Sequence, residues 1–171
     1  MKKFLSCVLS IVLVVLLAAC AVDDTPTKEH GDVQASAQKG EETYGLNETA
    51  AFKDLKFTAM EIKESDGDYF FAPESGNVFV GIKFTVENVS DEQQTVSSLL
   101  LFQGYADDVK CEYSFSAACA FDEGTLDGSL AAGKKLVGWY ALEVPEDWST
   151  IELEVQSAWL SNNSAKFVFT K

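Results

Sequence analysis

The sequence predicts an all-β fold in which two antiparallel sheets pack face to face across residues 44–171. Three observations lead to this prediction. Apolar and polar residues alternate in several short segments, which is the period of a half-buried strand. Clusters of Gly, Asn, Asp, Ser and Pro separate these segments, as turns do. Helical spacing is not sustained anywhere after the first 20 residues.

The N-terminus has the parts of a bacterial secretion signal in their usual order. Two lysines follow Met1, residues 4–17 are apolar except for two serines, and two alanines precede Cys20. The apolar run is shorter than the ~20 residues that a membrane-spanning helix needs. Residues 17–20, Leu-Ala-Ala-Cys, resemble the lipobox of bacterial lipoproteins, in which the cysteine is lipidated and becomes the mature N-terminus. We therefore expect a signal peptide over 1–19 and a lipid on Cys20.

The lipid determines where the protein is expected to reside. Two acyl chains on Cys20 anchor a protein stably, whereas one chain does not. The expected location is the cell membrane, on its extracytoplasmic face. Residues 20–43 are then small, polar and charged, with no apolar period, which is typical of a disordered linker. A flexible coil of this length has an end-to-end distance of about 25 Å.

The remaining chain is expected to form one Ig-like sandwich over 44–171, because seven or more short strands separated by turns are typical of that fold. Residues 78–86 and 109–116 alternate cleanly, whereas residues 136–142 are apolar on both faces. The alternation slips between Ala59 and Met60, which predicts a β-bulge. Further strands are expected at residues 55–57, 151–155 and 167–169, and turns at 65–68, 73–76, 104–108, 131–134 and 161–163.

Three stretches resemble a known family. Residues 76–90 form an apolar strand that ends in Glu-Asn-Val-Ser, and residues 102–108 form a strand that enters an acidic turn containing glycine. Residues 130–145 contain a turn, a glycine and an aromatic run that ends in Glu-Val-Pro. Together they resemble a family of extracellular Ig-like lipoprotein domains of unknown function, common in Gram-positive bacteria. By fold, that family is grouped with a secreted mycobacterial immunoprotective antigen.

The resemblance covers about residues 44–155 and implies the sandwich fold and a place outside the cytoplasm. Ala132 stands where the family often has proline, and Tyr140 stands where an apolar or aromatic residue is usual. Both changes are compatible with the fold. The family has no agreed catalytic residues, so the resemblance implies no chemistry.

The charge of the chain argues against nucleic-acid binding. The formal net charge is −14, and loss of residues 1–19 removes two lysines, which leaves 11 lysines against 27 acidic residues, or −16. The chain contains no arginine, the usual ligand of phosphates and guanine edges. Nucleic-acid affinity depends largely on neutralising phosphates. We expect no nucleic-acid partner, and a monomer.

The single histidine, His30, falls in the expected linker. A histidine-based triad, zinc site or acid–base pair is therefore excluded from the folded domain. No catalytic motif is present elsewhere, so we expect no enzymatic activity and no cofactor. An enzyme that uses two carboxylates is an alternative, which would require opposed acids in a cleft.

Two cysteines, Cys111 and Cys119, remain in the domain. The expected compartment permits a disulfide. An extended chain would place them about 26 Å apart, whereas a bridge requires ~6 Å, so the chain would have to reverse near residues 117–118. The alternative is two small buried apolar side chains.

Acidic turns are candidate calcium ligands, because hard cations bind several carboxylate and carbonyl oxygens. The weak candidates are Asp66, Asp68, Asp122 and Asp127. Their spacing fits no EF-hand loop, and acidic runs in so acidic a chain are usually solvated turns.

The run Tyr69-Phe70-Phe71 has two interpretations. It is either an exposed patch that contacts a partner or a short core strand, and the second is favoured. Trp148 and Trp159 allow the same two interpretations.

These observations predict a membrane-anchored lipoprotein with a non-catalytic binding domain. Its partners would be the membrane, through the lipid on Cys20, and a protein, wall polymer or small ligand held by loops or a sheet edge. The alternative function is a calcium- or solute-binding accessory lipoprotein of a membrane complex.

Overall fold

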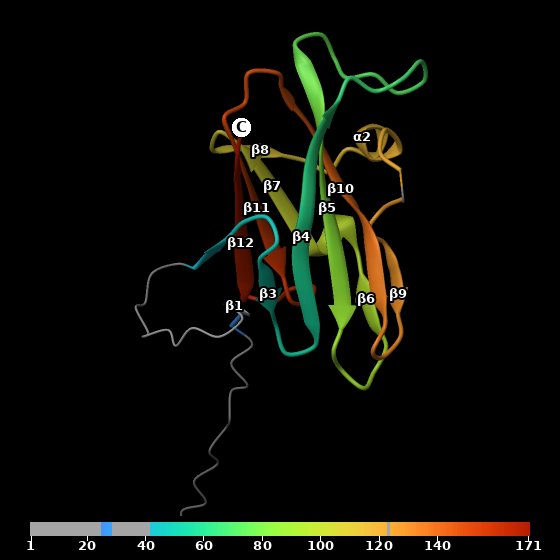
Figure 1. The fold of residues 1–171 in the computed structure, drawn as a ribbon, viewed down its shortest axis with the longest axis vertical. Helices are drawn as coiled ribbons and strands as arrows, with labels where there is room; N and C mark the ends of the chain where they lie inside the picture. The colour runs from blue at the N-terminus through green and yellow to red at the C-terminus, as the bar shows by residue number, and fades with distance from the viewer. Residues whose placement is uncertain (1–24, 29–41, 123) are drawn as a thin grey trace, which may run out of the picture.

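Two five-stranded sheets form the body of the protein (Figure 1). The computed structural model describes residues 25–28, 42–122 and 124–171. The first sheet has the order β1-β3-β4-β5-β10 and is antiparallel throughout. Its strands are β1 (Thr27–Lys28), β3 (Thr49–Ala51), β4 (Leu55–Ser65), β5 (Asn77–Asn88) and β10 (Lys135–Pro145).

The second sheet has the order β2-β12-β11-β7-β8. Its one parallel pairing joins β2 to β12, so this sheet is not purely antiparallel. Its strands are β2 (Thr43–Tyr44), β12 (Ser164–Thr170), β11 (Thr150–Gln156), β7 (Phe102–Ala106) and β8 (Val109–Cys111). A separate ribbon pairs β6 (Gln94–Val96) with β9 (Gly128–Leu130), and the helices are α1 (Ser98–Leu101) and α2 (Phe115–Cys119). The predicted two-sheet β-sandwich is confirmed.

Aromatic side chains fill the space between the sheets. Phe84 of β5 packs edge-to-face on Phe102 of β7 and on Phe167 of β12, at centroid distances of 5.5 and 5.2 Å. Phe102 also stacks on Tyr140 of β10 at 5.1 Å. Edge-to-face and offset geometries suit the ring quadrupole, and they add to the free energy that burial of the rings supplies. These residues come from four strands of two sheets, so the aromatic contacts join the two layers.

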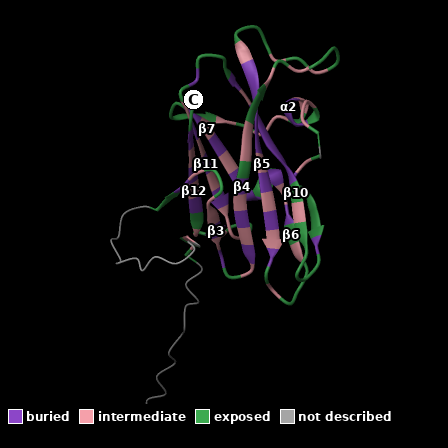
Figure 2. Cartoon of the chain, viewed as in Figure 1, coloured by how far each residue is buried: buried purple, intermediate pink, exposed green. Residues whose placement is uncertain are grey.

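The strand patterns predicted for β4, β5 and β10 are present. Every second residue of β5 from Val78 to Val86 is buried, and buried and half-buried bands alternate along β4 and β5 in Figure 2. The register of β4 against β5 shifts between Ala59 and Glu61, which confirms the predicted bulge. Trp139 and Tyr140 of β10 are both buried although they point to opposite faces.

The segment after β8 explains why β10 is covered on both faces. It leaves the second sheet and lies on the outer face of the first sheet, where Ala117 and Ala118 of α2 pack against Phe79 of β5 and Ala141 of β10. Ser114 caps the helix, since its hydroxyl oxygen accepts the backbone N–H of Ala117 at 3.1 Å. The chain thus forms a second, smaller core outside the sandwich.

The strand predicted over residues 109–116 is therefore only partly correct. β8 ends at Cys111, and α2 begins at Phe115, whose side chain is exposed rather than buried. An alternating pattern cannot distinguish a long strand from a short strand followed by a capped helical turn, and the serine that caps α2 decides between them here.

The turn after β5 is built on one buried amide, that of Asn88. Its Nδ2 donates to the carbonyl oxygens of Glu92 and Leu130 at 2.7 and 2.8 Å, and its Oδ1 accepts from the backbone N–H and hydroxyl of Ser90. Asn88 is fully buried. The Glu-Asn-Val-Ser ending of the strand is thus a structural motif that ties β5 to the turn before β10.

Part of the expected linker pairs with the domain. Thr27–Lys28 forms β1 on the edge of β3, and Lys28 contacts Glu48 at 2.9 Å. Thr43 belongs to β2. For these residues the expectation of disorder is wrong, because backbone pairing and an ion pair hold them on the sheet. Residues 1–24 and 29–41, which include the predicted signal peptide, Cys20 and His30, lie outside the described residues.

Candidate functional site

The outer face of the first sheet carries a hollow of about 250 Å³ beside α2. Sheet positions whose side chains point away from the sandwich form its floor, and the segment that follows α2 forms a wall. Its lining includes Lys63, Glu64, Lys83, Phe121, Asp122 and Trp139. This grouping was not predicted. The sequence does place Lys83 and Trp139 at outward positions of apolar strands. It does not reveal that these two residues lie opposite each other, because a single sequence does not show which strands pair.

Two stacked aromatic rings line the hollow, Trp139 from the sheet and Phe121 from the segment after α2. Phe121 stacks on Trp139 with 5.0 Å between centroids and 25° between planes. Gly81 permits this contact, because a Cβ atom there would lie 2.8 Å from the Phe121 ring. Gly138 has a similar role, since a Cβ atom would lie 2.6 Å from the carbonyl oxygen of Thr125. The two glycines therefore let the segment after α2 lie directly on the sheet.

Two lysines meet at the same indole. The ammonium groups of Lys63 and Lys83 each lie 5.6 Å from the centroid of the Trp139 ring. Lys63 also pairs with Glu61 at 2.9 Å. Asp122 is exposed and lines the hollow from the segment after α2. The hollow thus has cationic groups on its sheet side and a carboxylate on its loop side.

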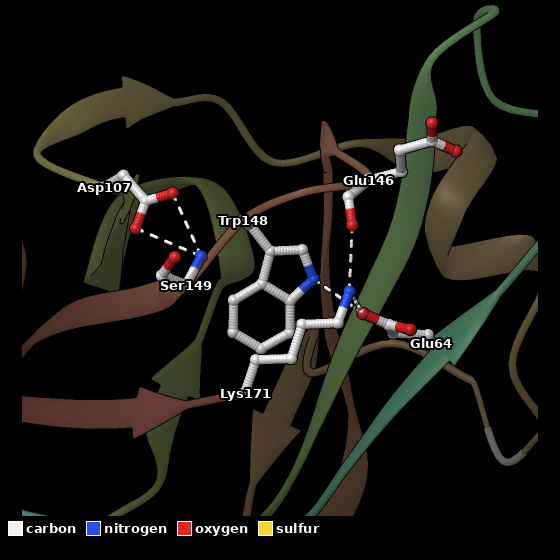
Figure 3. Close-up of polar contacts among 6 residues, drawn as sticks. All are labelled: Glu64, Asp107, Glu146, Trp148, Ser149 and Lys171. Carbon is white, nitrogen blue, oxygen red and sulfur yellow. Dashed lines mark hydrogen bonds and ion pairs between the residues drawn. The ribbon is translucent and has the colours of Figure 1, made fainter.

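The fourth charged residue of the hollow, Glu64, is held by a cluster at the end of the sandwich (Figure 3). Its Oε1 accepts from the indole N–H of Trp148 and pairs with the ammonium of Lys171, both at 2.7 Å. The hydrogen bond from Lys171, together with that from Trp148, holds the pKa of Glu64 below its ordinary value. Because Glu64 belongs to the first sheet and Lys171 follows β12, the cluster joins the two sheets.

Lys171 makes two further contacts within this cluster. Its ammonium donates to the carbonyl oxygen of Glu146 at 2.9 Å and lies 5.2 Å from the centroid of the Trp148 ring. Trp148 is buried, so its interpretation as a core residue is correct, whereas Trp159 is exposed.

Next to the hollow, loop 66–76 extends beyond the end of the sandwich (Figure 1). Asp68 orders the loop: its Oδ1 accepts the backbone N–H groups of Phe70 and Phe71 at 2.8 and 2.9 Å. The Asp68 N–H in turn donates to the Phe71 carbonyl at 2.7 Å. These bonds hold residues 68–71 in a tight turn.

The turn presents two aromatic side chains to solvent. Tyr69 is 95% exposed and Phe70 is 81% exposed, and their rings meet edge-to-face at 5.2 Å. The favoured interpretation of this run as a core strand is wrong. Only Phe71 packs inward, against the small core under α2. The pattern failed because the Asp68 turn separates three adjacent aromatics into two exposed residues and one anchor.

The structure distributes the candidate calcium ligands over different contacts. Asp68 is used by its own turn, and Asp127 accepts the backbone N–H and hydroxyl of Ser98 at 2.9 and 3.1 Å. Asp66 is exposed on the loop, and Asp122 lines the hollow. Within the described residues, no three His, Cys, Asp or Glu side chains gather as a metal site would require.

The acidic turn between β7 and β8 has a structural role. Both carboxylate oxygens of Asp107 accept the backbone N–H of Ser149, at 3.1 and 3.0 Å (Figure 3). Its Oδ1 also accepts the backbone N–H of Thr150 at 2.8 Å. These bonds hold the start of β11.

Cys111 and Cys119 are free thiols, so the structure does not contain the disulfide considered above. The chain reverses through α2, yet Cys111 is half-buried and Cys119 is exposed, which also excludes a pair of buried side chains. Burial raises the pKa of the Cys111 thiol. No helix among the described residues has the length and hydropathy to cross a membrane.

The architecture defines the protein as a β-sandwich with an additional small core on one outer face. The chain belongs to the family of domains of unknown function DUF4352, whose profile matches residues 44–166. No curated protein is significantly similar to it.

Solved structures share the fold at low identity. A Clostridium difficile β-sandwich protein of unknown function is 16% identical, with a TM-score of 0.52 over 81% of this chain and 99% of that one. The secreted Mycobacterium tuberculosis protein MPT63 is 12% identical, with a TM-score of 0.53 over 78% and 100%. The predicted lipoprotein ycdA of Bacillus subtilis is 15% identical, with a TM-score of 0.57, and the match spans 71% of this chain but only 38% of that one.

Proposed function

We propose that the protein is a lipid-anchored, extracytoplasmic and non-catalytic binding module. Its contact surface would be the distal end, defined here as loop 66–76, α2 and the adjacent hollow. The main observation that supports this proposal is that Tyr69 and Phe70 are almost fully exposed on a turn that Asp68 holds by hydrogen bonds. Exposed aromatic side chains on an ordered loop are typical anchors of an interface, because they bury a large area at a low entropic cost.

The packing of Phe71 supports this assignment. Phe71 packs against the small core that contains Ala117 and Ala118, so the turn is attached to α2 and not only to its own strand ends. Phe115 of α2 is itself 66% exposed. A partner could therefore contact the loop and the helix together as one preformed surface.

The position of the proposed lipid anchor at Cys20 agrees with a contact surface at the distal end. Six residues lie between Cys20 and Thr27, which is held on the sheet, so the two residues are at most about 25 Å apart. β1 pairs with β3, which in turn pairs with the start of β4, whereas loop 66–76 follows the end of β4. The 11 residues of β4 span about 33 Å, so its two ends lie at opposite ends of the sandwich. A lipid on Cys20 would hold the β1 end near the membrane and direct the distal end away from it.

The predicted lipobox and the names of two structural neighbours, a predicted lipoprotein and a secreted protein, agree with an extracytoplasmic location. The solute-binding accessory function remains a second candidate, favoured by the hollow between Lys63, Lys83 and Asp122. No catalytic family appears among the comparisons.

The test is affinity capture of the full chain from native membranes after chemical cross-linking. A Tyr69→Ser/Phe70→Ser double variant is compared with a Val109→Ser/Leu99→Ser control, which removes two other exposed apolar side chains. The proposal predicts that the first variant loses the cross-linked partner and the control keeps it. Equal capture of the partner by both variants would contradict the proposed contact surface. The proposed anchor would be contradicted if the chain were recovered outside the membrane fraction both with Cys20 intact and with a Cys20→Ala substitution.

A further inference from the structure

Large apolar side chains are exposed in two segments at one end of the second sheet. Trp159 and Leu160, in loop 157–163, are 65% and 76% exposed. Leu99 and Leu100 of α1 are exposed as well. We call these four residues the proximal patch. Single exposed apolar side chains need no explanation, whereas a group of them marks a surface that contacts a partner or a membrane.

Strand pairing places the two segments of the proximal patch at the same end of the sheet. α1 leads directly into β7, and the first residue of β7, Phe102, pairs with Val155 near the end of β11. Loop 157–163 follows β11. The two leucines of α1 also line a small hollow together with Gln156, the last residue of β11. The patch therefore combines a helix and a loop that are distant in the sequence.

Hydrogen bonds hold the loop while its apolar side chains face solvent. The Ser161 N–H donates to the carbonyl oxygen of Ala158 at 3.0 Å, which closes a turn around Trp159 and Leu160. The Ser161 hydroxyl accepts the backbone N–H of Asn163, also at 3.0 Å. Leu160 has a φ of 66°, a conformation that a bulky residue rarely adopts. Backbone outliers of this kind gather at functional sites.

The same two segments carry no charge in a strongly acidic chain. Residues 93–106 and 155–165 contain no Asp, Glu or Lys, and they are the longest such stretches after residue 22. The first charged residues on either side of the loop, Glu154 and Lys166, lie opposite each other in the strand register and have opposite signs. The chain from residue 20 onward has a charge of −16. A surface without acidic residues is therefore the part of the protein that an anionic bilayer repels least.

The proposed lipid would bring this end of the sandwich to a bilayer. Thr25 is the fifth residue after Cys20, so the two residues are at most about 18 Å apart. Thr25 and Pro26 line a cavity with Ser164, the first residue of β12, which directly follows loop 157–163. The residues nearest to the proposed anchor therefore lie beside the loop of the proximal patch, where β1 adjoins the start of β12 (Figure 1).

We propose that the proximal patch inserts into the interface of the lipid bilayer to which the protein is anchored. Trp159 lies at the level of the headgroups, where indole is favoured because the ring is apolar and its N–H is polar. Leu160 and the leucines of α1 reach the boundary of the acyl chains. The inference rests on the proposed function for the lipid on Cys20. It adds a second contact with the membrane, which orients the domain so that loop 66–76 points away from the bilayer.

The tryptophans of the chain provide the test. There are three, of which Trp139 and Trp148 are buried and Trp159 is exposed. The lipidated full chain is reconstituted in vesicles of phosphatidylcholine and phosphatidylglycerol, with dibrominated acyl chains, which quench indole on contact, in one of two otherwise equal preparations. The fluorescence of Trp159 is the difference between the unaltered chain and a Trp159→Phe variant. Vesicles are used because a detergent micelle around the lipid would also cover the patch.

The proposal predicts that brominated lipid removes at least about half of the Trp159 fluorescence, because the indole lies in the bilayer interface. A Leu99→Ser/Leu160→Ser variant should be quenched about half as much as the unaltered chain, since two of the four inserted side chains become polar. Val109→Ser is the matched control. It removes an exposed apolar side chain next to the turn between β7 and β8, at the opposite end of the second sheet, and should leave the quenching unchanged.

Flotation of the vesicles separates failure of the inference from failure of the proposed anchor. Unquenched Trp159 in a chain that floats with the vesicles would overturn the inference alone. So would equal quenching of the unaltered chain and the Leu99→Ser/Leu160→Ser variant. A chain that does not float with the vesicles would overturn both the anchor and the inference. The contact surface at Tyr69 and Phe70 is tested separately, by the capture experiment.

Discussion

The ring of Phe121 stacks on the indole of Trp139, and Gly81 lies beneath the contact without a side chain. This relationship holds the segment after α2 on the outer face of the first sheet. It creates the hollow and positions the small core on which loop 66–76 rests through Phe71. The binding surface that we propose therefore depends on Gly81, whose lack of a side chain leaves room for the Phe121 ring.

A Gly81→Ala substitution is expected to destabilise the protein by about 1–3 kcal/mol, because the new Cβ atom would lie 2.8 Å from the Phe121 ring and force it away. Denaturant unfolding of the full chain measures the change. Gly45→Ala is the control, since its Cβ atom would approach only Glu48, at 3.8 Å. Equal effects of both substitutions would show that the stacking does not depend on the space at residue 81.

Asn88→Ala is expected to cost about 2 kcal/mol, because the carbonyl oxygens of Glu92 and Leu130 lose their donor in a buried turn. The measurement is again the free energy of unfolding. Asn162→Ala, at an exposed turn, should change it by less than about 0.5 kcal/mol. A small change in the free energy of unfolding for Asn88→Ala would mean that water takes over the hydrogen bonds of the Asn88 amide.

The Glu64 cluster should contribute stability that disappears in acid. Hydrogen bonds from Lys171 and Trp148 lower the pKa of Glu64 in the folded state. The contribution is therefore present above the unfolded value, about 4.3, and is lost as the pH falls through the lower folded value. Exposure of both partners limits it to less than about 1 kcal/mol. Glu64→Gln should reduce stability at pH 7 and match the unaltered chain near pH 2.

A Glu152→Gln variant provides the comparison, because Glu152 pairs with Lys166 at the longer distance of 3.4 Å. If Glu64→Gln had the same effect at pH 7 and pH 2, the pKa of Glu64 would not be coupled to folding.

The two domain cysteines should react at different rates with iodoacetamide. Burial raises the pKa of Cys111, so its thiolate is scarce at neutral pH, whereas Cys119 is exposed. Peptide mass spectrometry of the full chain at pH 7.5 should show alkylation of Cys119 well before Cys111. In 6 M guanidinium chloride the difference should disappear. Faster reaction of Cys111 in the native protein would contradict the placement of α2.

Alternation along the chain predicted the sandwich because the period of two is a direct consequence of strand geometry. It identified β5, the bulge in β4 and the coverage of β10 on both faces. It failed at Phe115, where a serine cap begins a helix, and at Tyr69 and Phe70, where an aspartate turn reverses the chain. In both places the hydrogen bonds that one polar side chain accepts outweigh the local apolar pattern.

The hollow could not be predicted because its residues belong to β4, β5, β10 and the segment after α2. Their proximity depends on strand order and register, and on the crossing of one segment to the outer face of a sheet. Lys63 and Lys83 are ordinary strand lysines in the sequence. Trp139 gives them a common neighbour only after the strands pair.

The most direct test of the central claim is hydroxyl-radical footprinting of the chain on intact cells against the purified chain in detergent. Tyr69 and Phe70 are the most exposed aromatics of the described residues, so both should be heavily oxidised in the purified protein. We predict strong protection of both on cells, while Trp159, also exposed, reacts equally in the two samples. Equal oxidation of Tyr69 and Phe70 on cells and in detergent would contradict it.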